Sequence, residues 1–221
     1  RPGLISRAFG KARDYDRHAT AQAASARRLA ELALARGAAP GARVLDMGCG
    51  TGALARHLLA SGLPGRYVCA DISPDMLARA ARRLEGATPR PLLAAMDALE
   101  PALKPGFTLI ASSMALHWAQ DMKAALASLW GLLAPGGVLA VAIPGEGTFA
   151  PWRAALEALG FSCGLREFPS ATSLTAMFPG GAEIFEEHFS LGLSRALELP
   201  RHLKAVGGFV PRPGHAPLTP G

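Results

Sequence analysis

The fold is decided by the stretch Arg43-Val44-Leu45-Asp46-Met47-Gly48-Cys49-Gly50-Thr51-Gly52. Its first five residues read as a short buried strand that runs into closely spaced glycines. The following segment, 53–61, has the apolar spacing of a helix. Glycines between a strand and a helix let the backbone turn sharply and approach a ligand closely. The stretch therefore predicts a strand–loop–helix unit with a ligand site at the carboxyl end of the strand.

The same alternation of strand and helix continues along the chain. Further strands are expected at 67–70, 91–94, 107–111 and 138–143, with helices at 74–84 and 122–133. Alternating strands and helices indicate a mainly parallel, doubly wound α/β sheet with right-handed crossovers. In the helix at 74–84, we expect Arg79, Arg82 and Arg83 to point outward. A length of 221 residues suits a single domain over the whole chain, 1–221.

The segments on either side of this core, 42–145, are predicted to be mostly helical. Residues 1–40 form a helical N-terminal lid, with one helix expected over 5–36 that Gly37, Pro40 and Gly41 close. Residues 146–221 form a late helical insertion, with helices near 151–159 and 195–206 and a strand near 182–193. Only six strand candidates are found. A seven-stranded fold needs one more, so we expect a seventh strand beyond Gly221 or missing from this chain.

Composition excludes several classes of protein. Half of the residues are hydrophobic and 18% are charged, as in globular proteins. The longest purely apolar run, Val138–Ile143, is far too short to cross a bilayer, so we expect no membrane association. No secretory signal pattern is found, which favours a cytoplasmic location. Three cysteines without C-x-x-C spacing and scattered histidines predict neither a disulfide framework nor a metal site.

The net charge of +6 is concentrated near the N-terminus. Residues 1–36 hold eight basic and three acidic side chains, a local surplus of five. This surplus fits a solvated helix face or a surface that docks an acidic protein. Nucleic acid is disfavoured as a partner, because the basic residues are not interleaved with aromatic residues that could stack on bases. No motif specifies an oligomeric state.

Asp46 distinguishes between two kinds of cofactor for the glycine loop. The spacing Gly48-x-Gly50-x-x-Ala53 also fits a dinucleotide-binding fingerprint. A carboxylate two residues before the first glycine lies under the loop, where it fixes the loop or attracts an ammonium group. A pyrophosphate would be repelled there. The loop therefore favours a cofactor that carries an amino acid.

Two more acids follow the next two predicted strands. Asp71 comes 21 residues after Gly50 and is suited to accept both ribose hydroxyls of an adenosine. Alternatively, Asp71 caps the helix that begins near Pro74. Asp97 is suited to accept a hydrogen bond from an adenine amino group, although alone it would read as a surface aspartate. Three acids after three consecutive strands indicate an adenosine lying across the strand ends.

This ordered set over residues 42–145, together with the glycine-containing stretch 133–139, resembles the class I S-adenosylmethionine-dependent methyltransferases. Outside the core the sequence is most similar to the malonyl-acyl carrier protein O-methyltransferases of biotin synthesis, the BioC family. The stretches that carry this similarity are Phe9–Ala19 with Gln22, Ser112–Trp118, Gly147–Trp152 and Leu203–Gly208. Three positions depart from the family pattern. Thr108 replaces a usual aspartate, while Ser113 and His117 replace a common asparagine and glutamine, which affects the substrate side more than the cofactor side.

The resemblance implies a Rossmann-like fold, S-adenosylmethionine as cofactor, and methyl transfer to the free carboxylate of a malonyl thioester on acyl carrier protein. The residues implied to bind the cofactor are Tyr15, Gln22, Asp46, Gly48, Gly50, Asp71, Ile72, Met76, Asp97, Ala98 and Ser113. Candidate donors to the substrate carboxylate are Tyr15, His117 and Lys204, with Arg201 and His202 as further candidates; each also reads as a packing or surface residue. A carboxylate is already ionised at neutral pH, so no general base is expected.

Two other functions share this pattern. One is methylation of a small free acid such as trans-aconitate, which also needs no catalytic base. The other is a non-catalytic, methyltransferase-like assembly factor that keeps the cofactor pocket without turnover on malonyl carrier protein. The basic N-terminal arm favours the carrier protein as substrate, because acyl carrier proteins are acidic and complementary charge speeds encounter.

Overall fold

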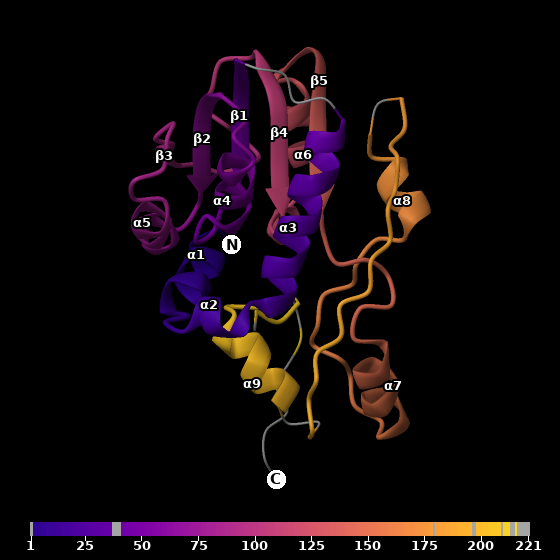
Figure 1. The fold of residues 1–221 in the computed structure, drawn as a ribbon. Coiled ribbons are helices and arrows are strands. Elements are labelled where there is room, and N and C mark those ends of the chain that lie inside the picture. Colours follow the sequence, from indigo (N-terminus) through magenta and orange to yellow (C-terminus); the bar gives the residue numbers. More distant parts are fainter. Residues whose placement is uncertain are drawn as a thin grey trace.

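The centre of the computed structural model is a five-stranded, fully parallel sheet (Figure 1). The structure describes residues 2–36, 41–178, 180–195, 198–208, 210–212 and 215. The strands are β1 (Ala42–Met47), β2 (Gly65–Asp71), β3 (Leu92–Ala95), β4 (Phe107–Ser113) and β5 (Leu133–Ala142), in the order β3-β2-β1-β4-β5. The parallel α/β sheet predicted from the sequence is confirmed, with five strands among the described residues.

The chain winds outward from β1 in both directions. Val44 of β1 is paired with Tyr67 of β2 on one side and with Leu109 of β4 on the other. At such a switch point the connections after neighbouring strands leave in opposite directions, and a crevice opens beyond the carboxyl ends of the strands. The glycine loop leaves β1 at this crevice, which positions it for binding a ligand.

Helices cover both faces of the sheet. They include α3 (Thr20–Ala35), α4 (Ala53–Ala60), α5 (Pro74–Arg83) and α6 (Met122–Trp130). Because side chains alternate along a strand, Ala42 and Val44 of β1 pack with α3 and α4 on one face. Leu45 and Met47 pack with α6 on the other face. The sheet is therefore doubly wound, as expected.

The N-terminal segment forms three helices, so the single helix expected over 5–36 is wrong. They are α1 (Pro2–Lys11), α2 (Tyr15–His18) and α3. The breaks turn the chain so that Phe9 and Tyr15 line the same cavity, with ring centroids 6.3 Å apart. A straight helix would carry residues six positions apart on different faces. Gly37 and Pro40, expected to close this segment, lie outside the described residues.

The end of the core also differs from the expectation. The helix expected over 122–133 ends at Trp130, and β5 begins at Leu133, which pairs with Phe107. A register irregularity between Phe107 and Leu109 accommodates the Pro-Gly-Gly part of β5 in the sheet. The short 3₁₀ helix η1 (Leu116–Trp118) follows β4.

Among the described residues, the late segment contains three helices; two lie on the β5 side of the molecule and the last lies against the N-terminal helices (Figure 1). They are α7 (Ala150–Ala158), α8 (Ala171–Thr175) and α9 (Glu198–Ala205). The strand expected over 182–193 is wrong, because these residues form no regular secondary structure. The segment is held to α3 by side-chain ion pairs, Arg28 with Glu187 and Arg36 with Glu183, in place of a backbone ladder. In the described part of the chain, no helix has the length and apolar character needed to cross a bilayer.

Candidate functional site

The glycine loop between β1 and α4 is shaped by its close contacts. Gly48 has a φ of +72°, and a Cβ atom there would lie 2.3 Å from the Cβ of Ala115. Only glycine fits this conformation and this gap. The Oδ2 atom of Asp71 accepts a hydrogen bond of 2.8 Å from the Gly50 N–H, and its Oδ1 atom accepts one of 2.8 Å from the Ser73 N–H. Burial raises the pKa of Asp71, while these backbone donors lower it.

Asp46 has one satisfied and one unsatisfied oxygen. Its Oδ2 atom accepts a hydrogen bond of 3.1 Å from the Ala55 N–H, at the start of α4. Its Oδ1 atom is buried and has no partner among the described residues. Burial raises the pKa of Asp46 to about 7; the Ala55 bond opposes this shift and the charge of Asp71 adds to it. A buried carboxylate oxygen without a donor, in the wall of a cavity, fits an ammonium group.

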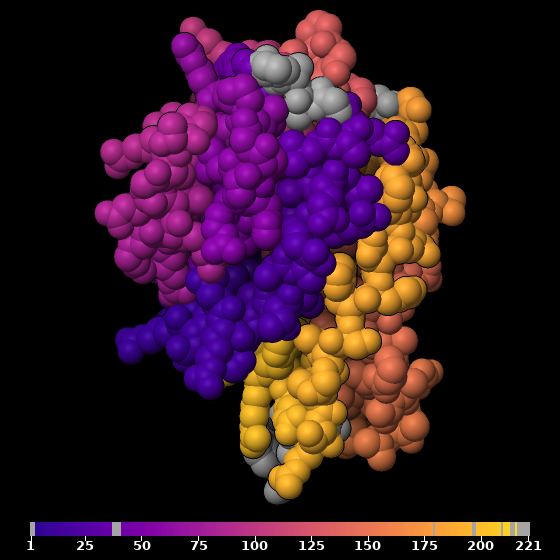
Figure 2. Space-filling view, viewed as in Figure 1, coloured from indigo at the N-terminus to yellow at the C-terminus, as the bar shows by residue number. Residues whose placement is uncertain are grey.

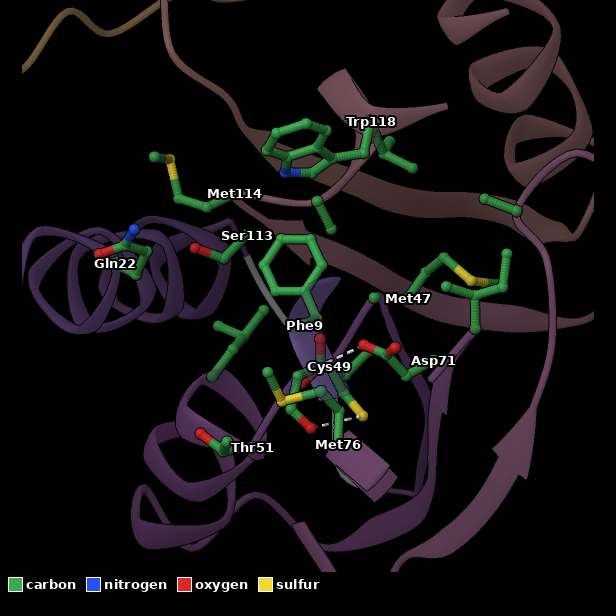
Figure 3. A pocket seen from close by; sticks show the side chains of 18 of the residues that line it. Phe9, Gln22, Met47, Cys49, Thr51, Asp71, Met76, Ser113, Met114 and Trp118 are labelled. Carbon is green, nitrogen blue, oxygen red and sulfur yellow. Dashed lines mark hydrogen bonds between the residues drawn. The ribbon is translucent and has the colours of Figure 1, made fainter. Parts of the chain in front are cut away.

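The first cavity, of about 390 Å³, lies beyond the carboxyl ends of the strands. All eleven residues that the resemblance implied for the cofactor line it, so the structure brings together residues from α2, α3, α5 and the ends of four strands. Figure 3 shows Phe9 between Gln22 and Ser113 on one side and Asp71 on the other. Asp97 also lines this cavity, and its Oδ1 atom accepts a hydrogen bond of 3.0 Å from the Leu99 N–H.

A polar network ties α2 to the glycine loop and to α5. The Oδ1 atom of Asp16 accepts a hydrogen bond of 2.6 Å from the Thr51 hydroxyl and lies 2.8 Å from Nη2 of Arg83. The Nη1 atom of Arg83 donates to Thr51 at 2.7 Å. The Nη2 atom of Arg79 donates to the Gly10 carbonyl at 2.8 Å. The expectation that Arg79 and Arg83 point outward is therefore wrong, because the N-terminal helices cover this side of α5.

A second, wider cavity of about 1540 Å³ adjoins the first. Its walls come mainly from α3, β5, the segment after β5 and α9. The residues that line both cavities are Phe9, Tyr15, Gln22, Met114, Trp118 and Arg166. The rings of Phe9 and Trp118 meet edge to face there, with centroids 5.7 Å apart. A ligand in the wide cavity can therefore reach the first cavity past three aromatic rings and one cation.

Arg166 is the only basic side chain among the described residues that lines both cavities. Its Nη1 atom donates a hydrogen bond of 2.6 Å to the His117 carbonyl, and its guanidinium lies over the Trp118 ring, 5.3 Å from the centroid. Arg166 could not be predicted from the sequence, because it lies in an irregular segment between α7 and α8 where no motif or periodicity marks it.

The three expected carboxylate donors are placed differently. Tyr15 lines both cavities, and burial raises the pKa of its phenol, so it stays a hydroxyl donor. His117 lines the wide cavity alone; burial and the charge of Arg166 lower its pKa to about 3, and its buried Nδ1 atom has no partner among the described residues. Lys204 is exposed and lines neither cavity, so the structure does not bring it to the site.

The two further candidates on α9 also differ. His202 is half-buried and lines the wide cavity, whereas Arg201 is exposed. No group of three or more histidine, cysteine, aspartate or glutamate side chains among the described residues is arranged to hold a metal ion. Tyr15, His117 and Arg166 thus supply a phenol, a neutral imidazole and a guanidinium to the cavity walls.

Comparison with known proteins places this site in a family. Residues 45–139 match the model of a methyltransferase domain. The chain is 34% identical to the malonyl-[acyl-carrier protein] O-methyltransferase of Magnetococcus marinus, over 99% of this chain and 82% of that protein. It is 38% identical to the biotin biosynthesis bifunctional protein BioCD of Bordetella avium, over 97% of this chain. It spans 46% of that longer protein.

A solved structure supports the fold. It is a chain of the complex between the Trm112 methyltransferase activator of Haloferax volcanii and a candidate methyltransferase. The similarity covers 79% of this chain and 74% of that chain, with a TM-score of 0.59 and 23% identity.

The parallel sheet, the glycine loop and the acids at three strand ends are those of a class I methyltransferase that uses S-adenosylmethionine. Within this class, the chain belongs to the malonyl-[acyl-carrier protein] O-methyltransferase family, which takes part in biotin biosynthesis.

Proposed function

We propose that this protein transfers the methyl group of S-adenosylmethionine to the free carboxylate of a malonyl thioester carried on acyl carrier protein. The observation that carries the proposal is that the two cavities meet. The acids predicted to bind the cofactor line the first cavity, and Arg166 lies where the wide cavity joins it. The family of the chain supports the same reaction.

The residues of the first cavity fit the parts of the cofactor. The unpartnered Oδ1 atom of Asp46 suits the cofactor's amino group. A carboxylate has about four acceptor positions, so Asp71 can accept from ribose hydroxyls as well as from Gly50 and Ser73. Asp97 is suited to the adenine amino group. When bound, S-adenosylmethionine supplies an electrophilic methyl group on a sulfonium.

Arg166 and Tyr15 take the roles of substrate donors. The positive charge of Arg166 attracts a carboxylate to the junction of the cavities, and the Tyr15 hydroxyl is a neutral donor on the same boundary. His117 stays neutral and offers Nδ1 from the wide cavity. Lys204 was predicted from the sequence to have this role, and Arg166 has it in its place.

Catalysis then rests on alignment and on exclusion of water. The substrate carboxylate needs no base, because it is ionised at neutral pH. Holding one carboxylate oxygen leaves the other to attack the methyl carbon in a near-attack arrangement. Methyl transfer from a bound sulfonium to a carboxylate would remove both charges. The apolar rings of Phe9 and Trp118 at the junction therefore favour the transition state over the charged ground state.

A substrate comparison tests the proposal. Transfer of labelled methyl from S-adenosylmethionine is measured with malonyl-acyl carrier protein, malonyl-pantetheine and trans-aconitate at low and high salt. We expect the highest kcat/KM with the malonyl carrier protein. Its KM should rise with salt, because acyl carrier proteins are acidic and the N-terminal arm of this chain is basic. A higher kcat/KM with trans-aconitate would contradict the proposal. Cofactor binding without turnover on any of the three would indicate the assembly role.

A further inference from the structure

Two groups of basic side chains on the N-terminal helices and α9 differ in their pairing. The first group lies on α3 and at its C-cap residue, and each of its arginines contacts a glutamate. The pairs are Arg27 and Arg28 with Glu31, Arg28 with Glu187, and Arg36 with Glu183. This face of α3 is thus neutralised within the molecule and holds the 182–193 segment in place.

The second group is not neutralised. Arg13 and Arg17 lie at the corner formed by α1 and α2, and Arg201 and Lys204 lie on α9. All four side chains are exposed, and none has an acidic partner within ion-pair distance in the described part of the chain. We call these four residues the α2–α9 basic surface.

Packing joins these two distant parts of the sequence. The rings of His18 on α2 and His202 on α9 meet edge to face, with centroids 6.4 Å apart. Just after α9, a Cβ atom on Gly207 would lie 2.7 Å from Cδ1 of Phe9, so the chain there rests directly on α1. Figures 1 and 2 show α9, in yellow, against the indigo N-terminal helices at one end of the molecule.

The helix α9 has one face that lines the wide cavity and one face that is exposed to solvent. Leu199, Leu203 and Val206, at positions i, i+4 and i+7, line the wide cavity. Arg201 and Lys204, three positions apart, share a face that points to solvent. The helix α2 is similar, since Tyr15 lines both cavities while Arg17 is exposed. The same two helices therefore wall the cavities and carry the unpaired charge outside them.

The chemistry of this surface selects an acidic protein as its partner. Like charges gathered without counter-ions repel one another, and an oppositely charged partner relieves that repulsion. Binding of single-stranded nucleic acid also needs exposed aromatic rings for stacking. The large aromatic side chains that are exposed in the described part of the chain lie on other segments; they are Trp130, Phe161, Phe185 and Phe189.

We infer that the α2–α9 basic surface docks the acidic face of the acyl carrier protein, whose thioester arm enters the wide cavity beside α2 and α9. The identity of the partner rests on the proposed function. Lys204 then binds the partner outside the cavities and does not hold the substrate carboxylate.

Direct binding tests this inference apart from turnover. Fluorescence anisotropy of labelled holo-acyl carrier protein is titrated with the wild type, with Arg201→Glu/Lys204→Glu, and with the control Arg66→Glu/Lys104→Glu. The control makes the same charge change at exposed residues near the amino ends of β2 and β4, away from the cavities. We expect the Kd of the first variant to rise about tenfold or more at low ionic strength, with a smaller rise at high salt and none in the control.

Malonyl-pantetheine lacks the acidic carrier protein, so its turnover shows whether the cavities still bind and convert a substrate in the charge-reversed variant. We expect its KM to be unchanged in Arg201→Glu/Lys204→Glu. The milder variant Arg201→Gln/Lys204→Gln should give a smaller rise in the Kd for carrier protein.

Three results would overturn the docking surface. They are equal Kd values for the wild type and the charge-reversed variant, an equal rise of the Kd in the control variant, or an equally large loss of malonyl-pantetheine turnover in the charge-reversed variant. A wild type that binds carrier protein through this surface yet transfers no methyl group to its malonyl form would refute the proposed function alone.

Discussion

The Oδ2 atom of Asp71 accepts a hydrogen bond of 2.8 Å from the backbone N–H of Gly50. The same carboxylate holds the Ser73 N–H through Oδ1, and Ser73 in turn caps α5 by accepting from Met76. One side chain thus connects the end of β2, the glycine loop and the start of α5. The sequence left ribose binding and helix capping as alternatives for Asp71. The structure shows contacts that organise loop and helix, and the ribose contact stays a prediction.

Replacing Asp71 should disrupt the cofactor cavity. In Asp71→Ala, two backbone donors lose their charged acceptor and the proposed ribose contacts disappear. We expect the Kd for S-adenosylmethionine to rise about 100-fold, as for a loss of about 3 kcal/mol. Calorimetry measures this, with Glu85→Ala, an exposed acid just after α5, as the control. Equal Kd values for Asp71→Ala and the wild type would remove Asp71 from the cofactor site.

Cofactor binding should depend on pH through Asp46. Its pKa of about 7 in the ligand-free protein means that it is largely protonated below pH 7. An ammonium beside it favours the ionised form, so binding below pH 7 must release a proton. Affinity should therefore fall as the pH drops from about 7 to about 5.5, by up to about tenfold per pH unit. Calorimetry at several pH values tests this. Asp46→Asn should bind more weakly with little pH dependence; the same slope in this variant would contradict the assignment.

Arg166 should affect the substrate more than the cofactor. In Arg166→Gln the junction of the cavities loses its positive charge, so the KM for the malonyl carrier protein should rise about tenfold or more. The Kd for S-adenosylmethionine should stay close to that of the wild type. Arg195→Gln is the matched control, because Arg195 lines the wide cavity only. A similar KM in both variants would show that charge at the junction is not used.

His117 should act as a neutral group. With a pKa of about 3, it carries no proton to lose between pH 5 and pH 8. His117→Gln keeps a neutral polar side chain, so we expect it to retain kcat/KM within about threefold and to leave the pH profile unchanged over that range. Steady-state rates across this pH range are the measurement. An acid limb near pH 6.5 that disappears in His117→Gln would show that the imidazole titrates during turnover.

The Asp16 network should slow release of the cofactor. Asp16 joins α2 to Thr51 in the glycine loop and to Arg83 on α5. Without it, α2 opens more readily, and we expect S-adenosylmethionine to dissociate several-fold faster from Asp16→Ala in a stopped-flow chase. The control is Asp14→Ala, since the Asp14 side chain makes no capping hydrogen bond to α2. Equal dissociation rates for both variants would show that the network does not restrain this opening.

Local patterns in the sequence predicted the core of the fold and many of the residues that line the first cavity. The run from Arg43 to Gly52 gave both the strand and the loop, because strand burial and glycine conformation are set by neighbouring residues. Asp71 and Asp97 were placed by strand endings alone. Since parallel strands end at one edge of the sheet, acids that are distant in sequence could be expected to line one cavity.

What the sequence did not predict depends on contacts between distant segments. Arg79 looked solvated by helical periodicity, yet it binds a carbonyl of the N-terminal segment 69 positions earlier. The 182–193 segment had the composition of a strand but meets α3 through its glutamates. Arg166 lines the cavities from an irregular segment. Lys204 was predicted to bind the substrate carboxylate, although its helix face is exposed. Propensity and periodicity carry no information about such partners.

Intact-protein mass spectrometry of malonyl-acyl carrier protein, incubated with S-adenosylmethionine and this protein, is the most direct test of the proposed methyl transfer. We expect the malonyl carrier protein to gain the mass of one CH₂ unit, and we expect no gain with Asp71→Ala. Fragmentation that ejects the acylated pantetheine arm should place the added mass on that arm, because the new group is a methyl ester of the malonyl carboxylate. An unchanged mass with the wild type, under conditions where calorimetry shows cofactor binding, would contradict the proposed methyl transfer.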